Sequence, residues 1–417
     1  MAADLRHRVP AQPPADPVPA GAAPAPSSHP SGKEKHGRLV QVLRGLSFGV
    51  YFMTCAIAIN ATQFLGAPLY WIDRDLFYVY MSLTKRSFGL LITTATHWWG
   101  PTTIRISGDA SVADQMRKTE DGLVEFSFPE RMIMIANHQI YTDWSYLWWV
   151  GYANRPKMHG SIYIILKESL KYIPIVGPGM MFYGFIFMSR KMAVDQPRLA
   201  HRLGKLKTRH TAPDGKSYLN PMWLLLFPEG TNASQNGRNK SAKWAEKIGV
   251  KDPEHMLLPR STGIYFCLNE LKGTVEYVYD CTVAYEGIPS SRRGQFGEKL
   301  FTLSGTYFRG QPPKSVNFYW RRFRVADIPL DDQGQFDLWL RERWYEKDAL
   351  MEQYISTGRF PASPSEVLTK GQEGFLETEV RTRHWFEFLQ IFAVLGLFGA
   401  FGLMINSILK LWSRLSP

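Results

Sequence analysis

The stretch MIMIANHQIYTDW, residues 132–144, is the most informative part of the sequence for the fold. It opens with a short apolar run that predicts a buried strand, and residues 144–153 predict a helix. His138 and Asp143 are five positions apart, so on one unbroken helix they would point about 140° away from each other. They can meet only if His138 lies in a turn and Asp143 lies in the first turn of the helix. The stretch therefore predicts both side chains at the carboxyl end of a strand, where active sites of open α/β sheets lie.

Further apolar runs of similar length predict buried strands elsewhere in the chain, at residues 162–166, 185–188, 223–227 and 275–283. Helical segments are predicted between them, including residues 197–208 and 241–248. Such alternation favours an α/β fold with a mostly parallel sheet flanked by helices. We assign residues 101–330 to this domain and residues 331–384 to a charged helical extension, whose Glu342, Glu346 and Lys347 are typical of a solvated face.

Composition narrows the class of protein. The chain has 417 residues, a net charge of +12 and three scattered cysteines. So few cysteines, without metal-ligand spacing, argue against a disulfide framework or a zinc site. A basic balance fits nucleic acid, acidic ligands or an anionic lipid surface.

The N-terminal part combines a polar segment with apolar ones. Residues 1–37 are rich in Pro, Ala and Ser, which predicts disorder, and they do not form a secretory signal. Residues 45–72 carry no charge, so they predict a helix long enough to cross a bilayer, the alternative being a buried core helix with its loop. Residues 87–100 are too short to span securely and end in His97, Trp98 and Trp99, residues that favour the membrane interface. We expect residues 38–100 to form membrane-associated helices that either cross the bilayer or dip into one leaflet.

The C-terminal part holds the clearest membrane signal. Residues 388–409 are uncharged, basic residues flank both ends, and Trp385 and Trp412 lie where interfacial aromatic residues are found. Residues 385–412 are therefore predicted to form a transmembrane helix. Nucleic acid is then a poorer explanation of the positive charge than anionic lipid.

The pair His138 and Asp143 is suited to general base chemistry. An Asp that accepts a hydrogen bond from one imidazole nitrogen fixes the tautomer, and the other nitrogen can take a proton from an attacking hydroxyl. The only Gly-x-Ser-x-Gly match, residues 45–49, lies in the uncharged N-terminal stretch and not at a predicted strand–helix turn, so direct attack by a substrate hydroxyl is simpler than a covalent acyl-enzyme. The alternative is that Asp143 only caps a helix and His138 only fills a turn.

Three other stretches carry candidate binding residues. LLLFPEGT, residues 224–231, places Glu229 in a sharp turn where Gly230 lets the backbone approach a ligand and Thr231 can bind phosphate or glycerol oxygens. GFIFMSRK, residues 184–191, places Arg190 at a strand end, where its guanidinium suits phosphate oxygens. LLPRST, residues 257–262, centres on Pro259. Each alone is also compatible with an ordinary turn or a surface side chain.

In this order the four stretches resemble the glycerophospholipid acyltransferase family. Its blocks are an H-x4-D pair, a G-x-x-F-x-x-R segment, an F-P-E-G-T segment and a proline-centred apolar segment, and together they cover about residues 125–350. The resemblance implies that His138 is the general base and that Asp143 orients it. It further implies that Arg190, Glu229, Gly230 and Thr231 hold the glycerol-phosphate of the acceptor.

The same resemblance places Pro259 on the acyl-CoA side. Family members often have an acidic residue just before the Arg of the second block, where this chain has Ser189, so the charge partner of Arg190 stays open. The stretches at residues 166–180, 281–289 and 338–348 look most like the lysocardiolipin and lysophosphatidylinositol branch. In that branch Lys167 and Lys171 can attract a headgroup or CoA, or can simply lie on a solvated helix face.

These expectations combine into one function. We expect a membrane-bound enzyme that transfers a fatty acyl group from acyl-CoA, as co-substrate, to a lysophospholipid during phospholipid remodelling, without a metal or other cofactor. We expect it in the endoplasmic reticulum membrane, with another endomembrane or the mitochondrial outer membrane as the alternatives, and with its catalytic face to the cytosol. A lysophosphatidate acyltransferase of de novo synthesis, a lipid hydrolase and a non-catalytic lipid-binding scaffold are the alternatives. The acceptor headgroup, the acyl chain, the organelle and the oligomeric state stay open.

Overall fold

The structure of the protein, a computed structural model, describes residues 29–189, 191–212, 214–288, 295–364 and 374–415. Its centre is a sheet with strands β1 (Thr103–Gly108), β4 (Arg131–Ala136), β5 (Ile162–Lys167), β6 (Ile186–Met188), β9 (Met222–Leu226), β10 (Tyr277–Tyr285), β11 (Ser315–Arg324) and β12 (Leu376–Glu379). These eight strands follow the order β12-β1-β11-β10-β4-β9-β5-β6. All neighbours pair in parallel except β10 with β11 and β1 with β12, which confirms a mostly parallel sheet. Two small hairpins, β2 (Met116–Lys118) with β3 (Val124–Phe126) and β7 (Arg209–Thr211) with β8 (Ser217–Leu219), complete the strands described.

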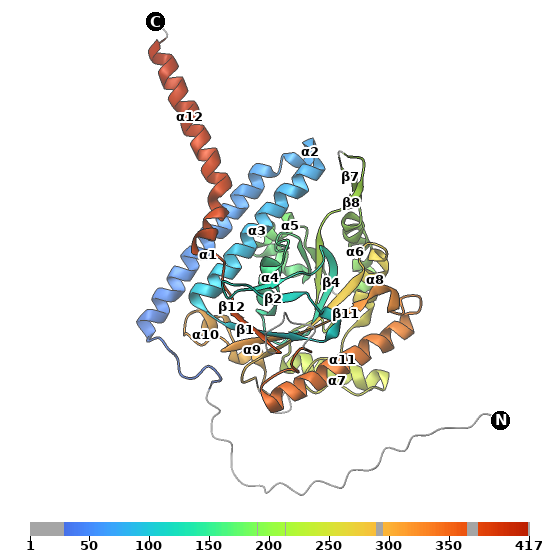
Figure 1. Ribbon diagram of the computed structural model, residues 1–417. Helices are drawn as coiled ribbons and strands as arrows, with labels where there is room; N and C mark the ends of the chain where they lie inside the picture. The colour runs from blue at the N-terminus through green and yellow to red at the C-terminus, as the bar shows by residue number, and fades with distance from the viewer. Residues whose placement is uncertain (1–28, 190, 213, 289–294, 365–373, 416–417) are drawn as a thin grey trace, which may run out of the picture.

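Helices surround this sheet (Figure 1). In chain order they are α1 (Arg38–Gly66), α2 (Leu69–Ile72), α3 (Arg74–Trp99), α4 (Asp143–Ala153), α5 (Val176–Phe182), α6 (Met192–Leu206), α7 (Gln235–Ile248), α8 (Ser261–Leu271), α9 (Gly297–Leu300), α10 (Leu303–Tyr307), α11 (Gln333–Thr357) and α12 (Ala393–Leu415). Short 3-10 segments are η1 (Ala110–Val112), η2 (Glu168–Tyr172), η4 (Val325–Asp327) and η5 (Trp385–Phe392).

Both faces of the sheet are covered by helices. This burial explains why the sequence of β4 is an unbroken apolar run. Met132 and Met134 belong to a core cluster that includes residues of α3 and α4. Ile133 and Ile135 belong to a second cluster that includes residues of α6, α8 and α11. Because successive side chains of a strand point to opposite faces, every residue of this run is removed from water. The predicted strand is therefore confirmed, together with the α/β class.

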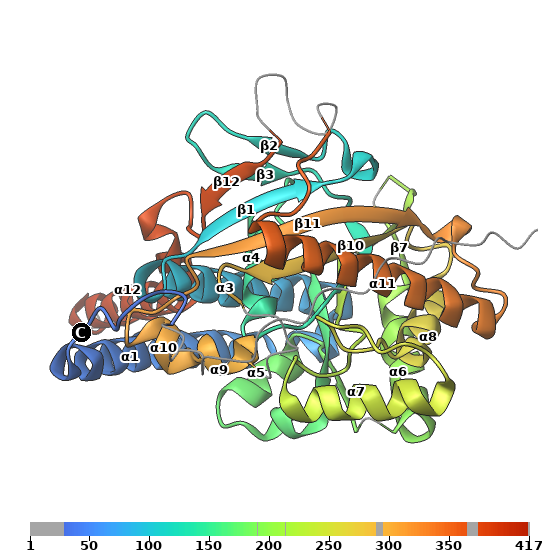
Figure 2. The same ribbon diagram turned by 90° about the horizontal axis from the view of Figure 1, so that it is seen from below.

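The segment expected to be a charged helical extension is part of the core. α11 runs across β10 (Figure 2), and it buries Phe336, Leu340 and Trp344. Lys347, which was expected on a solvated face, is fully buried, and its ammonium donates to Asp280 and to the carbonyl of Cys281. The same segment also contains β12, which pairs with β1 at the edge of the sheet.

Two features of the N-terminal part of the chain were not expected from the sequence. Most of residues 1–37 lies outside the described residues, but residues 29–36 are held against the body and are not disordered: Lys35 N donates to Arg309 O at 3.0 Å, and Gln311 Nε2 donates to Gly32 O at 2.8 Å. In the second half of α3 the protein covers most side chains, whereas Trp98 near the end of the helix is exposed. Residues 89–96 are all buried, because α3 packs between α1 and α4.

Two stretches are long and apolar enough to cross a membrane, Arg38–Ile72 and Trp385–Ser413. The outer face of α1 exposes many large apolar side chains, and α12 projects from the body with almost every described side chain exposed (Figure 1). The predicted C-terminal helix begins later than expected, since residues 385–392 form η5, whose Glu387 is buried against Tyr152.

Candidate active site

The turn between β4 and α4 brings His138 and Asp143 together. His138 lies in the turn and α4 begins at Asp143, which is the placement that their spacing requires. His138 Nδ1 lies 2.8 Å from Asp143 Oδ2. Asp143 is fully buried, whereas 19% of the His138 side chain is exposed. The carboxylate therefore holds one nitrogen of the ring, and Nε2 is the nitrogen that can exchange a proton with a substrate.

Several donors fix the Asp143 carboxylate in turn. Its Oδ2 also accepts the backbone N–H groups of Gln139 at 2.6 Å and of Ile140 at 3.1 Å. Its Oδ1 accepts a hydrogen bond from the hydroxyl of Tyr285. A carboxylate with this many donors has a single orientation, and so has the imidazole that rests on it.

The turn after β9 closes the other side of the imidazole. The Phe227 ring stacks on His138 with their centroids 4.4 Å apart. Glu229 follows and is buried, with Oε1 accepting the backbone N–H of His138 at 3.4 Å and Oε2 without a hydrogen-bond partner among the described residues. Burial raises the pKa of the Glu229 carboxyl to about 8, and the negative charge of Asp143 acts in the same direction. At neutral pH this carboxyl therefore keeps its proton in most molecules and can donate a hydrogen bond as well as accept one.

Gly230 gives this turn its shape. Its N–H donates to Phe227 O at 2.9 Å and its φ is +72°, in the left-handed region that favours glycine. A Cβ at this position would meet no atom within 4 Å, so the glycine serves the backbone and not a tight packing contact. Thr231 follows it and is half-buried.

Comparison with known proteins gives this arrangement a family. The acyltransferase family model matches residues 116–286, and the model of the acyltransferase C-terminus matches residues 306–380. An uncharacterised acyltransferase of Schizosaccharomyces pombe is 35% identical over 85% of this chain and 94% of its own length. The chain belongs to the acyltransferase family.

Other relatives have more specific names. The 2-acyl-1-lysophosphatidylinositol acyltransferase of Saccharomyces cerevisiae is 37% identical over 78% of this chain and 87% of its own length. Lysophosphatidylinositol acyltransferase 10 of Caenorhabditis elegans is 30% identical over 76% of this chain and 73% of its own length. The resemblance to a lysophospholipid acyltransferase branch is therefore confirmed.

The remaining site residues of this acyltransferase differ in how close they lie to the pair. Pro259 is buried next to the Glu229 turn, because the adjacent Arg260 N–H donates to Pro228 O at 2.7 Å. Arg190 lies outside the described residues. Both of its neighbours are held by Asp195, whose carboxylate accepts the N–H groups of Ser189 at 2.9 Å and of Lys191 at 3.1 Å.

The two candidate lysines are placed differently. Lys167 is exposed at the end of β5, on the strand next to β9 in the sheet. Lys171 is engaged by Glu168, with Nζ to Oε1 at 2.7 Å, and Arg198 binds the same carboxylate at 3.1 Å. Lys167 is the freer of the two to meet an anionic headgroup or CoA, whereas Lys171 already has a partner.

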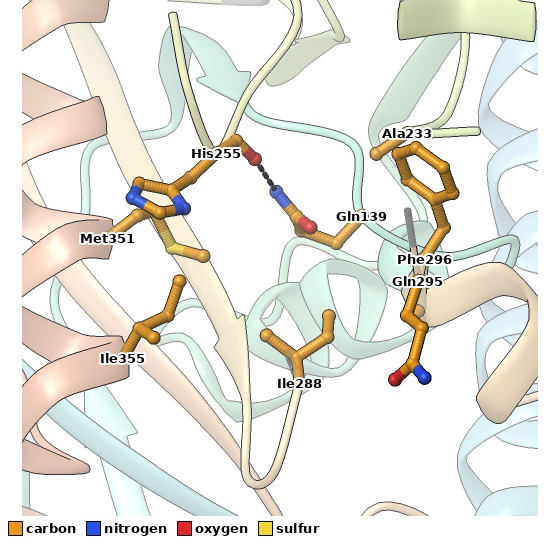
Figure 3. A pocket seen from close by; sticks show the side chains of 9 residues that line it. Gln139, Ala233, His255, Ile288, Gln295, Phe296, Met351 and Ile355 are labelled. Atoms are coloured by element: carbon orange, nitrogen blue, oxygen red, sulfur yellow. Dashed lines mark hydrogen bonds between the residues drawn. The ribbon is translucent and has the colours of Figure 1, made fainter. Parts of the chain in front are cut away.

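A hollow of about 280 Å³ adjoins the turn between β4 and α4 (Figure 3). Gln139, the residue after His138, lies on its wall and donates through Nε2 to His255 O at 3.1 Å. His255, Glu254 and Glu352 come close enough together to hold a metal ion. His255 Nε2 already contacts Glu352 Oε2 at 2.5 Å, so the closeness of these two side chains is explained by their contact with each other.

Sequence reasoning assigned no role to Asn137 or Tyr285. Asn137 lies in residues 132–144 and Tyr285 in residues 281–289. Neither residue belongs to a motif whose spacing would link it to the chemistry of His138. Asn137 is next to His138 in the sequence, whereas only the pairing of β4 with β10 brings Tyr285 to the turn.

Proposed function

We propose that this acyltransferase moves a fatty acyl group from acyl-CoA to the free hydroxyl of a lysophospholipid. The observation that carries the proposal is the imidazole of His138, held by buried Asp143 through Nδ1 at the end of a parallel strand. This arrangement suits the deprotonation of a hydroxyl. Membership of the acyltransferase family supplies the reaction class.

In the proposed reaction His138 Nε2 takes the proton of the lysolipid hydroxyl while the oxygen attacks the thioester carbon. Asp143 stabilises the imidazolium that forms. The tetrahedral intermediate then expels the CoA thiolate, which takes the proton back from the imidazolium and leaves as the thiol. The buried, mostly protonated Glu229 accepts the backbone N–H of His138 through Oε1, and we propose that its other oxygen hydrogen-bonds the acceptor.

Lipid surroundings are supported by the apolar surface of the helices. A hollow of about 300 Å³ lies among α1, α3 and α5, and its walls include Phe52, Ile59 and Leu91. α12 exposes large apolar side chains along its length, a surface that water does not stabilise. We propose that α12 crosses a membrane and that α1 rests in it, with the catalytic body on the cytosolic side of the endoplasmic reticulum, where acyl-CoA is available.

The names of two relatives make lysophosphatidylinositol the first acceptor to test. Membranes containing the protein are incubated with radiolabelled oleoyl-CoA and, in separate reactions, lysophosphatidylinositol, lysocardiolipin, lysophosphatidate or no acceptor. We expect label to enter phosphatidylinositol most rapidly, with CoA released in equal amount. Release of CoA without an acceptor would instead indicate a hydrolase, and failure to acylate any of the three would contradict the proposal.

A further inference from the structure

The geometry points to Tyr285 as a positioning residue for the acyl transfer. Its hydroxyl donates to Asp143 Oδ1 and so fixes the carboxylate on which the His138 imidazole rests. This inference rests on the proposed function, because it assigns a role in the same proton transfer. Tyr285 is fully buried and its hydroxyl is bonded to Asp143, so its role in the transfer is through Asp143.

The two carboxylate oxygens of Asp143 have separate partners. Oδ2 receives His138 and the backbone of the turn, while Oδ1 receives Tyr285. A carboxylate held only through Oδ2 can rotate about its Cβ–Cγ bond. The phenol on the opposite oxygen removes that freedom, so the direction of Oδ2 toward His138 Nδ1 is set from the far side.

The tyrosine is itself held rigidly. It is the last residue of β10 and is fully buried, with its ring 5.8 Å from that of Phe301 and 6.2 Å from that of Tyr146. A side chain packed on both sides in this way has one position, and its hydroxyl points to one place.

A second link fixes β10 to the catalytic turn. The backbone pairing of β4 with β10 ends at Ala136 and Cys281. Beyond it the Asn137 side chain continues the pairing, with Nδ2 donating to Val283 O at 2.9 Å and Oδ1 accepting Val283 N–H at 2.7 Å. Asn137 precedes His138, and Val283 lies two residues before Tyr285. The strand that carries the phenol is thereby tied to the turn that carries the imidazole.

The charge balance gives the direction of a pH effect. Without the phenol the Asp143 carboxylate keeps more of its negative charge, so it stabilises the His138 imidazolium more and binds its own proton more tightly. Both changes move the acidic limb of the kcat/KM profile to higher pH. The other titratable groups around this pair are Glu229 after β9, Cys281 on β10, Tyr146 on α4 and Lys347 on α11, and Tyr285→Phe replaces none of them.

The test is Tyr285→Phe, which keeps the ring and removes only the hydroxyl. Acylation of lysophosphatidylinositol by oleoyl-CoA is measured against pH in the purified full-length protein. We expect kcat to fall about 10-fold or more, as for loss of a hydrogen bond to a charged group, with the KM values for both substrates nearly unchanged. The acidic limb should move to higher pH.

Tyr146→Phe is the matched control. Tyr146 is buried beside Tyr285, but its hydroxyl makes no hydrogen bond to Asp143, so kcat and the pH profile should stay near those of the unmodified protein. An unchanged kcat or an unshifted acidic limb in Tyr285→Phe contradicts the positioning role while leaving the proposed function intact. So does a Tyr285→Phe protein that no longer folds, because the hydroxyl would then serve the fold. Absence of transfer by the unmodified protein contradicts both.

Discussion

Asp143 is the first residue of α4, and its carboxylate points back over the turn that precedes the helix. The capping alternative would have it accept N–H groups within the first turn of α4. It instead accepts those of Gln139 and Ile140, which lie before the helix, and it contacts His138 with the same oxygen. Holding the turn and orienting the imidazole are therefore one arrangement, which the five-residue spacing allowed us to predict.

The buried carboxyl of Glu229 lowers the free energy of unfolding at neutral pH. Its folded-state pKa, about 8, lies above the ordinary value of 4.5, so burial favours the protonated form. As pH rises from 4.5 toward 8 the unfolded chain loses this proton and the folded chain keeps it. The free energy of unfolding then falls by up to about 1.4 kcal/mol per pH unit.

We therefore expect Glu229→Gln to raise the thermal unfolding midpoint in detergent, more at pH 7.5 than at pH 5. The amide oxygen can still accept the His138 N–H, so the turn should keep its shape. Glu342→Gln is the control, since this glutamate lies largely exposed on α11 and should change the midpoint little at either pH. Equal midpoints for Glu229→Gln and the unmodified protein at both pH values would show that the buried carboxyl carries no such penalty.

At the scale of elements, strands were predictable where they are apolar on both faces. β4, β5, β6, β9 and β10 were all expected, with ends shifted by a few residues. β1 and β11 were not, because charged residues interrupt them. The structure shows how those charges are accommodated: Arg105 on β1 pairs with Glu286 and Glu377, and Arg321 on β11 pairs with buried Asp280. The sequence does not indicate such ion pairs, because they form only when the strands lie side by side.

The helices, like the strands, were only partly predictable from the sequence. The apolar run 388–409 was correctly predicted to be mostly helical, but apolar content alone did not separate α12, whose side chains are exposed, from the second half of α3, which protein buries. An apolar helix face is expected to be covered, but the sequence pattern does not indicate whether protein or lipid covers it.

The exposure of α12 leads to a prediction about membrane insertion. A tag after Pro417 should be protected from protease in sealed microsomes if α12 crosses the bilayer away from the body. Leu403→Arg should reduce the protected share, because an arginine near the middle of a spanning helix costs roughly 2.5–3.5 kcal/mol. Leu403→Ala is the matched control and should leave the tag protected. A tag that is fully digested in the unmodified protein would show that α12 does not span.

Over the whole molecule, the site depends on segments that are far apart in the sequence. β10 supplies Tyr285, the turn after β9 supplies Glu229, and α11 places buried Lys347 behind them against Asp280. The order of the four motifs was enough to predict the family and the contact of His138 with Asp143, while the catalytic role of this pair stays a prediction. The burial of Lys347 and the contact of Tyr285 depend on tertiary packing, so no local pattern could have indicated them.

Replacement of His138, the proposed general base, is the most direct test of the proposed mechanism. His138→Ala is compared with His201→Ala, a change of an exposed histidine on α6, in membranes with matched amounts of protein. We expect His138→Ala to lower the rate of acyl transfer from oleoyl-CoA to lysophosphatidylinositol about 100- to 10,000-fold, as for loss of a general base, and His201→Ala to keep the full rate. A His138→Ala protein that transfers the acyl group at close to the unmodified rate would contradict the catalytic role of the His138 and Asp143 pair.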